Sequence, residues 1–469
     1  MSREKQLVKN TAIVAIGKIC TQFISFFLLP LYTAMLSTEE YGTVDLLNTY
    51  ISLLLPLIIL QIDQGIFRFL IDARENEKEK RILISTTMII ITLQSVAYLI
   101  IYAIVGQFIN NQYKYFLATN VVASIFSSVM LQISRGLGDN KTYSVGSLIS
   151  ASGTVILNVI FIVVFKWGAY GMLIASLLAN CLCAIFVFLK KKLYKYILKN
   201  SFSKKHLRSI WKYSIPLVPN MLSWWIVNAS DRTIISNLID IGANGIYSAA
   251  NKFSSVCITF FNIFNMTWSE SASMYIKDKD SSIYFTKTID TALRIFSAIC
   301  TGIIAIMPFV FSILINEKFD DAYYQIPILM MSTLCNIIVS LLGSVYVAKK
   351  NSKEIAKTSI LAAIINIVVN LVLIKFMGLY AASISTLVAY LAMAIYRYID
   401  VQKYIKIKID FKLVLYTILI SIIIFTTYYM RITWLSIISV IITVFYAILI
   451  NRNTIGILFN VLKRRFNKI

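Results

Sequence analysis

The stretch ILISTTMIIITLQSVAYLIIYAIV at residues 82–105 decides the fold class of this chain. It holds no charged residue, no proline and no glycine, and the charged run RENEKEKR at residues 74–81 precedes it. A helix needs about 20 consecutive apolar residues to cross a bilayer core about 30 Å thick. Because residues 82–105 exceed that length without a break, they are predicted to form a transmembrane helix.

Apolar runs of the same kind recur along the whole sequence. The 469 residues are 58% hydrophobic and only 14% charged, with a mean hydropathy of +0.75, whereas a soluble domain carries about 25% charged residues. We therefore expect an all-α integral membrane protein with about fourteen transmembrane helices. The predicted spans are residues 11–34, 45–70, 82–105, 113–134, 143–165, 168–189, 213–236, 245–268, 290–315, 325–347, 357–376, 378–398, 411–430 and 432–450.

The basic residues predict the orientation of these helices. Most of the 45 Lys and Arg residues lie near the two ends of the chain and in the connections that follow even-numbered spans. The remaining connections hold few: Lys114, Lys166, Lys318, Lys375 and Arg431. Since basic loops stay in the cytoplasm, both termini are predicted to be cytoplasmic, in a bacterial inner membrane. The net charge of +23 then reflects topology and attraction to anionic membrane lipid, not nucleic acid binding.

The longest connection is the basic stretch between the sixth and seventh spans. It divides the chain into two predicted six-helix lobes, followed by a C-terminal helix pair. The expected domains are 1–190 (first lobe), 191–212 (cytoplasmic linker), 213–400 (second lobe), and 401–469 (last two spans and basic tail). Repeated halves are typical of transporters, which bind substrate between the halves near the membrane midplane.

Polar residues recur at helical spacing within five predicted spans. The stripes are Lys18, Thr21, Gln22 and Ser25; Gln61, Asp63, Gln64 and Arg68; Asn120, Ser124, Ser128 and Gln132; Asn220, Trp224, Asn228, Asp231 and Arg232; and Ser248, Lys252, Ser255, Thr259 and Asn262. Side chains three or four residues apart share one helix face. Such stripes can simply mediate helix packing. Together, the five stripes indicate a shared water-filled cavity.

The ionisable residues identify a predicted substrate. A charge at the bilayer centre costs at least about 2.5–3.5 kcal/mol, so buried charges are typically functional. A cavity lined by Lys18, Arg232 and Lys252 would select an anion, and hydroxyl, amide and aromatic groups suit a sugar. The other predicted substrate-binding residues are Gln22, Arg68, Asn220, Trp224, Ser255 and Asn262. Arg68 and the tryptophans have an alternative role as anchors at the membrane interface.

An energy source for transport is predicted from intramembrane carboxylates. No Walker A motif is present in the sequence, so coupling to an H⁺ or Na⁺ gradient is expected. The candidate ion-coupling residues are Asp63, Asp231 and Glu270, because carboxylates within spans often act as relays. No cofactor or metal site is expected, because the six cysteines lie in apolar segments and the only histidine is His206.

Short motifs resemble the polysaccharide flippases of the multidrug/oligosaccharidyl-lipid/polysaccharide exporter superfamily. They are Pro30, Ser37–Gly42, Gly65–Arg68, Arg135–Gly136 with Tyr143, Ile215–Pro219, Asp231–Arg232, and Gly245–Ser248 with Lys252. The resemblance implies two six-helix lobes around a cationic cavity that opens alternately to each side. It also implies export of undecaprenyl-diphosphate-linked repeat units for O antigen, capsule or a related polymer, with polymerase or assembly proteins as possible partners.

Three other functions are considered. Lipid II flippases of the same superfamily are relatives with a chemically similar substrate, whereas its multidrug exporters usually have twelve spans and cation-attracting carboxylates. A membrane glycosyltransferase or polymerase would use paired carboxylates such as Glu39–Glu40 or Asp278–Asp280. Such enzymes generally need a large external loop, and none is expected here. We therefore predict a transporter and not an enzyme.

Overall fold

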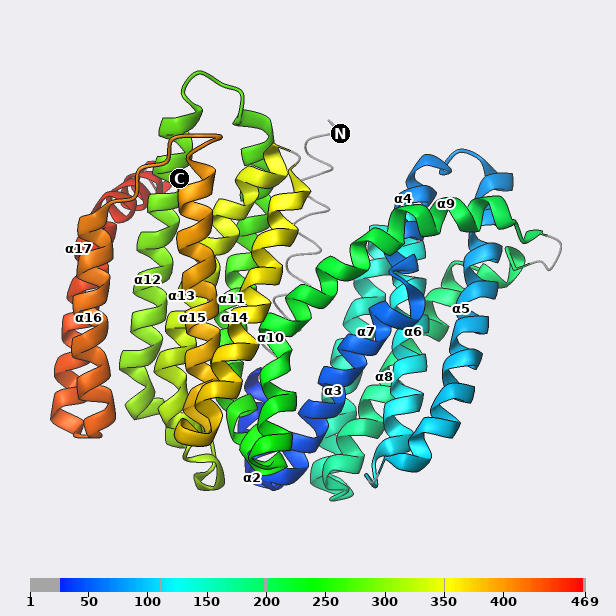
Figure 1. Cartoon of the computed structure of the whole chain (residues 1–469), viewed down its shortest axis with the longest axis horizontal. Helices are drawn as coiled ribbons and strands as arrows, with labels where there is room; N and C mark the ends of the chain where they lie inside the picture. The colour runs from blue at the N-terminus through cyan, green and yellow to red at the C-terminus, as the bar shows by residue number, and fades with distance from the viewer. Residues whose placement is uncertain (1–25, 110, 198–200, 350, 467–469) are drawn as a thin grey trace. The chain divides into compact units, whose positions relative to one another are not determined.

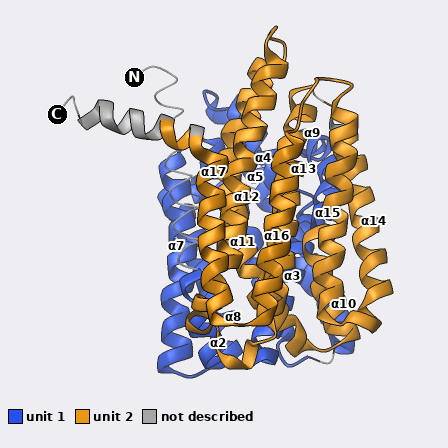
Figure 2. Ribbon diagram, turned by 90° about the vertical axis from the view of Figure 1, so that its left-hand side faces the viewer, with its two compact units in different colours: residues 1–225 blue, residues 226–469 orange. Residues whose placement is uncertain are grey.

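The computed structural model describes residues 26–109, 111–197, 201–349 and 351–466. Lys18 and Gln22, and most of the first predicted span, lie outside these residues. Every regular element in the described part of the chain is a helix, which confirms the all-α prediction. The chain divides between Trp225 and Ile226 into two compact units, coloured separately in Figure 2.

The first unit is built from helices that run alongside one another and from short connecting helices (Figure 1). They are α2 (Leu29–Met35), α3 (Thr38–Ile59), α4 (Ile62–Asp72), α5 (Glu77–Val105), η1 (Gly106–Phe108), α6 (Lys114–Gly136), α7 (Asn140–Asn158), η2 (Val159–Val164), α8 (Gly168–Lys190), η3 (Leu193–Lys195), α9 (Lys204–Ser214) and η5 (Ile215–Leu217). Helix α9 overlaps the end of the predicted basic linker, residues 191–212, and packs on α4 and α5. Helix α10 (Val218–Leu238) contains the division between the units.

The second unit holds the longest helices of the described chain. They are α11 (Ile241–Tyr275), α12 (Ser281–Leu314), η6 (Glu317–Phe319), α13 (Ala322–Ala348), α14 (Ser352–Met377), α15 (Leu379–Val401), α16 (Phe411–Met430) and α17 (Thr433–Phe466). Helix α13 packs against α11, α12, α14 and α15, and is therefore the core of the unit. Helices α16 and α17 pack on α12 and on each other as the predicted C-terminal pair.

The number of long apolar helices agrees with a multi-pass membrane protein. Eleven helices of the described residues are long and apolar enough to cross a membrane. Helices α10 and α11 are not among the eleven, although they contain 21 and 35 residues. Both carry several of the polar residues singled out in the sequence. Together with these two helices, thirteen of the fourteen predicted spans correspond to long helices of the described residues, and most of the first lies outside those residues.

The predicted second span, residues 45–70, is two helices and not one. Helix α3 ends at Ile59, and α4 begins at Ile62. Leu60 and Gln61 have left-handed backbones, with φ of 51° and 56°. Such conformations are uncommon for residues other than glycine and cluster at functional sites. The break places Asp63 in the first turn of α4, where the helix dipole favours a carboxylate.

Side-chain caps explain where several helices begin. Ser37 and Glu40 form a capping box at the start of α3: Ser37 Oγ accepts from the Glu40 amide, and the Glu40 carboxylate accepts from the Ser37 amide. Asp139 caps α7, and Asp240 caps α11, by accepting from an amide three residues ahead. These caps satisfy amide groups that have no partner within the helix. The α6–α7 connection is therefore a short, well-defined turn.

Candidate functional site

Asp231 of α10 is the centre of a buried polar network in unit 2. The residue is only 2% exposed. Its Oδ2 atom accepts hydrogen bonds from the Thr386 hydroxyl of α15 at 2.6 Å and from the Tyr247 hydroxyl of α11 at 3.0 Å. Its Oδ1 atom accepts from the Asn370 side-chain amide of α14 at 2.9 Å. Four helices therefore meet at one carboxylate.

Further polar side chains surround this centre and hold its members in place. The Asn366 amide donates to the Thr386 hydroxyl at 3.2 Å, and the Ser230 hydroxyl donates to Asn366 Oδ1 at 3.2 Å. On the neighbouring turn of α10, Asn228 Oδ1 accepts from the Tyr390 hydroxyl at 2.6 Å. A connected polar network of this kind rigidifies its surroundings when its members are satisfied.

The atoms of the network suit a monovalent cation or a proton. Carboxylate, hydroxyl and amide oxygens are the ligands that hard cations prefer. Asn370 Oδ1 is buried and accepts no hydrogen bond from the rest of the described chain, so it remains available as a ligand. A buried carboxylate held by several helices can bias the packing of those helices when it gains or loses a cation.

The other predicted residues of unit 2 lie along α10 and α11. Arg232 is half-buried, and its Nη1 atom donates to a backbone carbonyl one turn earlier at 2.8 Å. Lys252 and Ser255 are half-buried on one turn of α11, where the Ser255 hydroxyl donates to the Lys252 carbonyl at 2.8 Å. Asn262 and Glu270 are exposed further along the same helix. Burial therefore distinguishes Asp231 from Glu270 as a candidate relay.

The predicted binding residues of unit 1 have different surroundings. Asn220 and Trp224 are half-buried at the start of α10. Arg68 is exposed and forms an ion pair with Asp72 at 2.7 Å, one turn further along α4. The Trp225 indole, in contrast, donates to a backbone carbonyl and to a hydroxyl of α3, both at 3.1 Å. These contacts give Trp225 a packing role in unit 1.

Asp63 is the buried carboxylate of unit 1. It is 5% exposed, and its Oδ2 atom accepts from the Gln64 amide at 2.9 Å and from the Ser128 hydroxyl of α6 at 3.4 Å. Its Oδ1 atom is buried and has no hydrogen-bond partner among the described residues. A buried carboxylate oxygen without a partner is costly, so a bound proton would stabilise this position.

A polar cavity of about 480 Å³ lies beside Ser128 in unit 1. Its lining comes mainly from α6, α7 and α8: Leu55, Ser124, Ser127, Ser128, Leu131, Gln132, Tyr143, Ser144, Ser147, Leu148, Ser150, Ala151 and Asn180. Nine of its thirteen lining residues carry a hydroxyl or amide group, although most of the lining surface is apolar, and no charged side chain of the described residues lines the cavity. The predicted stripe Ser124, Ser128 and Gln132 thus faces this cavity, whereas Asn120 donates to a carbonyl of α8 at 3.3 Å.

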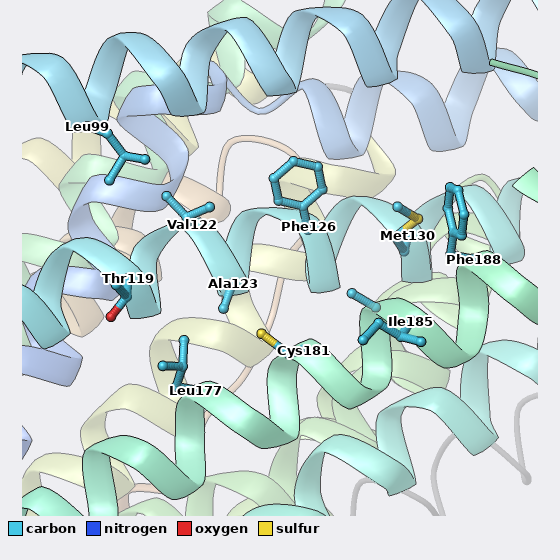
Figure 3. A pocket seen from close by; sticks show the side chains of 11 residues that line it. Leu99, Thr119, Val122, Ala123, Phe126, Met130, Leu177, Cys181, Ile185 and Phe188 are labelled. Carbon is cyan, nitrogen blue, oxygen red and sulfur yellow. The ribbon is translucent and has the colours of Figure 1, made fainter. Parts of the chain in front are cut away.

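The opposite side of α6 faces a second, almost wholly apolar pocket of about 440 Å³, shown in Figure 3. Val122, Phe126 and Met130 of α6 line it together with Leu177 and Ile185 of α8. At about 100° per residue, these α6 positions lie on the helix face roughly opposite the serine stripe. Helix α6 therefore separates a polar cavity from an apolar one.

Two residues have structural roles here: Glu40, from the carboxylate pair weighed for an enzyme, and Trp268 of α11. Glu40 belongs to the capping box of α3, and its Oε1 atom also accepts from the Ala169 amide at 3.4 Å. Trp268 is 2% exposed, donates to the Leu341 carbonyl at 3.2 Å and packs edge-on against Phe285. Neither contact leaves the group positioned as an open reactive or stacking surface.

Sequence reasoning identified Asp231 but missed most of its partners. Asn366 and Asn370 are fully buried and lie four residues apart on α14, in an otherwise apolar span. That spacing is a signal of the kind used for the other stripes, and it could have found them. Thr386 and Tyr390 repeat the spacing on α15. The network joins these two stripes through Asp231.

Solved structures of membrane transporters share this fold. An inward-facing multidrug resistance transporter of the MATE family, in the MOP superfamily, has a TM-score of 0.69 at 14% identity, covering 83% of this chain and 97% of its own. The lipid II flippase MurJ, in an inward closed conformation, has a TM-score of 0.68 at 17% identity, covering 97% of this chain and 99% of its own. The fold therefore defines a multi-pass membrane protein of the MATE and MurJ architecture.

A sequence comparison then gives the family. The family described as polysaccharide biosynthesis protein matches residues 7–269, which is more than half of the chain. This chain belongs to that family. An uncharacterized membrane protein of Methanocaldococcus jannaschii is 23% identical over 403 residues, which cover 81% of this chain and 94% of the relative. The predicted resemblance to polysaccharide proteins is confirmed by this family, and the fold is one that a multidrug transporter of the MOP superfamily and a lipid II flippase share.

Proposed function

We propose that this protein is a flippase for lipid-linked oligosaccharides. It moves undecaprenyl-diphosphate-linked repeat units from the cytoplasmic to the outer leaflet by alternating access, in a polysaccharide pathway such as O antigen or capsule. The headgroup enters from the cytoplasm while the prenyl chain remains in lipid. Rearrangement of the two halves then exposes the headgroup to the other side. Both termini lie in the cytoplasm of a bacterial inner membrane, and polymerase or assembly proteins are partners downstream.

The observation that carries this proposal is the extent of the fold. The lipid flippase structure covers 97% of this chain, whereas the multidrug transporter structure covers 83%. The last two helices, α16 and α17, are the part of this chain that an exporter with twelve spans would lack. Together with the polysaccharide biosynthesis family, this favours a lipid-linked sugar as cargo. A lipid II flippase is the second candidate, because that structural relative is named for lipid II.

The proposed coupling element is the Asp231 network. A cation or proton bound there would neutralise the carboxylate that joins α10, α11, α14 and α15. Its gain or loss can therefore shift the equilibrium between two arrangements of those helices. Asp63 is the corresponding candidate in unit 1, and Glu270 ranks below both because it is exposed.

The proposed anion site consists of basic side chains. Lys18, Arg232 and Lys252 attract the diphosphate, and Gln22, Asn220, Trp224, Ser255, Asn262 and Arg68 contribute around it. Arginine and lysine are the usual partners of phosphate groups. The half-buried positions of Arg232 and Lys252 in unit 2 are compatible with contact to a charged ligand.

The test is a translocation assay with the full-length protein in sealed vesicles. Two cargoes are compared, an undecaprenyl-diphosphate oligosaccharide and lipid II, each with and without imposed H⁺ and Na⁺ gradients. Selective transport of the oligosaccharide supports the proposal, and selective transport of lipid II replaces it by the second candidate. Lys252→Gln and Arg232→Gln are expected to slow transport at normal protein levels. If neither changes the rate, the anion site is placed wrongly. If the folded protein transports neither lipid, the flippase function is rejected.

A further inference from the structure

We infer that the polar cavity of unit 1 binds an uncharged, polyhydroxylated part of the cargo, namely saccharide units. The inference rests on the proposed function for the source of this ligand. Arg68, Arg232 and Lys252, which are proposed for the diphosphate site, are not among the residues that line this cavity. The cavity volume of about 480 Å³ lies within the range, roughly 300–1,000 Å³, of sites for small molecules.

The chemistry of the lining is unusual for helices that cross a membrane. Six serine hydroxyls, the amides of Gln132 and Asn180, and the phenol of Tyr143 are among the groups that face the cavity. Polar groups at bilayer depth need hydrogen-bond partners. Water or a polar ligand in the cavity can supply such partners.

Several of these groups have hydrogen-bonding capacity to spare. Gln132 Oε1 and Ser144 Oγ are buried and find no partner in the described part of the chain. Asn180 Oδ1 accepts a hydrogen bond from the Ser150 hydroxyl at 3.2 Å. This contact does not use the amide N–H groups of Asn180. Asp63, which is 5% exposed, accepts a hydrogen bond from the lining residue Ser128. Its Oδ1 atom has no partner among the described residues. These unpaired atoms have almost no accessible surface, so a ligand in the cavity reaches them only after their side chains rotate.

The type of ligand follows from the lining. Hydroxyl and amide groups can each donate and accept, which matches the alternating donors and acceptors of a sugar. Lys and Arg side chains, which a diphosphate would require, are absent from the described lining. Tyr143 adds an aromatic group, and the Arg135 guanidinium lies 5.8 Å from its ring centroid, at the α6–α7 turn. The cavity therefore favours a neutral ligand with hydroxyl groups, such as saccharide, over phosphate.

The first test is photo-crosslinking of the full-length protein in cells that make the polymer. The photoreactive residue p-benzoylphenylalanine replaces Ser147 in the polar cavity, and in a matched variant it replaces Phe126 in the apolar pocket. Cells are grown with tritiated monosaccharides, irradiated, and the protein is purified for counting and mass spectrometry. A glycan adduct at position 147 and only lipid adducts at position 126 are expected. Glycan at both positions, or phospholipid alone at both, would overturn the inference.

A second measurement covers the case in which the bulky residue prevents accumulation. Gln132→Met and Asn180→Leu nearly keep side-chain volume and remove hydrogen-bonding groups, and Val122→Leu in the apolar pocket is the control. Translocation in vesicles should show a KM for the lipid-linked oligosaccharide raised about tenfold in the two cavity variants and unchanged in the control. If the wild type transports this lipid and both cavity variants keep its KM, the cavity is not the saccharide site, while the flippase function stands.

Discussion

Replacing Asp231 by asparagine should uncouple transport from its ion gradient without unfolding the protein. The asparagine side chain keeps the size of the aspartate but loses its charge and one acceptor oxygen. Hydrogen bonds to a charged group are worth about 1.5–3 kcal/mol each, against about 0.5–1.5 for neutral ones. Three such bonds converge on Asp231. The summed loss of about 3 kcal/mol is offset in part because a buried carboxylate no longer has to be desolvated.

The net cost of Asp231→Asn is therefore about 1–2 kcal/mol, since the hydroxyls of Tyr247 and Thr386 can rotate to accept. Asp231→Leu, in contrast, leaves three donors unsatisfied at about 1–3 kcal/mol each, or roughly 3–9 kcal/mol in total. Thermal unfolding in detergent should show this order. Only the asparagine variant is then suitable for measuring function.

The decisive assay compares vesicle transport of the lipid-linked oligosaccharide with and without an H⁺ or Na⁺ gradient. The wild type should be accelerated by one of the two gradients, and Asp231→Asn should transport at one unstimulated rate. Asp63→Asn is the parallel variant in unit 1. Full gradient stimulation in Asp231→Asn, with its loss in Asp63→Asn, would refute the assignment and move coupling to unit 1.

Three further predictions concern stability and the exposed ion pair of Arg68 with Asp72. Gly136→Ala should destabilise by about 1–3 kcal/mol in thermal unfolding, because a Cβ there would lie 2.8 Å from Leu70 Cβ, whereas Gly302→Ala, with nothing within 4 Å, should be neutral or slightly stabilising. Hydrogen bonds from the Thr142 amide and hydroxyl and from Lys191 outweigh the raising effect of burial and lower the pKa of Asp139 to about 2. Because this folded pKa lies below the usual value of about 3.9, the carboxylate contributes stability above pH ~4, about 1 kcal/mol once solvent screening of a partly exposed group is allowed for. Asp139→Asn should therefore be less stable than wild type at pH 7, and the gap should close as the pH falls from about 4 to about 2; an equal gap at both ends would contradict the pairing. Arg68→Ala should leave the melting temperature unchanged, so any loss of transport would report on function.

The sequence predicted the membrane class and most spans because both depend on local composition. Apolar stretches such as residues 82–105 became single helices, α5 among them. The break at Leu60–Gln61 was not predicted, because the flanking residues are apolar and neither residue is glycine or proline. Left-handed backbone at such positions is imposed by tertiary packing and has no local sequence signal.

The candidate site was predictable only in part, for a related reason. Asp231 is conspicuous in a span because a charge in lipid is costly. Its partners Asn370 and Thr386 lie more than 100 residues away, on helices that read as apolar. A single sequence gives no pairing between helices, so the network appeared as separate stripes. Trp225 is a second example: the contacts of its indole with α3 have no signal in the sequence.

The two buried carboxylates differ in a way that separates their proposed roles. Both oxygens of Asp231 accept hydrogen bonds from other helices, so a change in its charge acts directly on the packing of unit 2. Asp63 has one oxygen without a partner in the described chain and touches a lining residue of the polar cavity. A ligand that binds Ser128 would change the hydrogen bond that Asp63 accepts from it. If the cavity binds saccharide, neutralising Asp63 should alter the KM for cargo, whereas neutralising Asp231 should alter the response to the gradient.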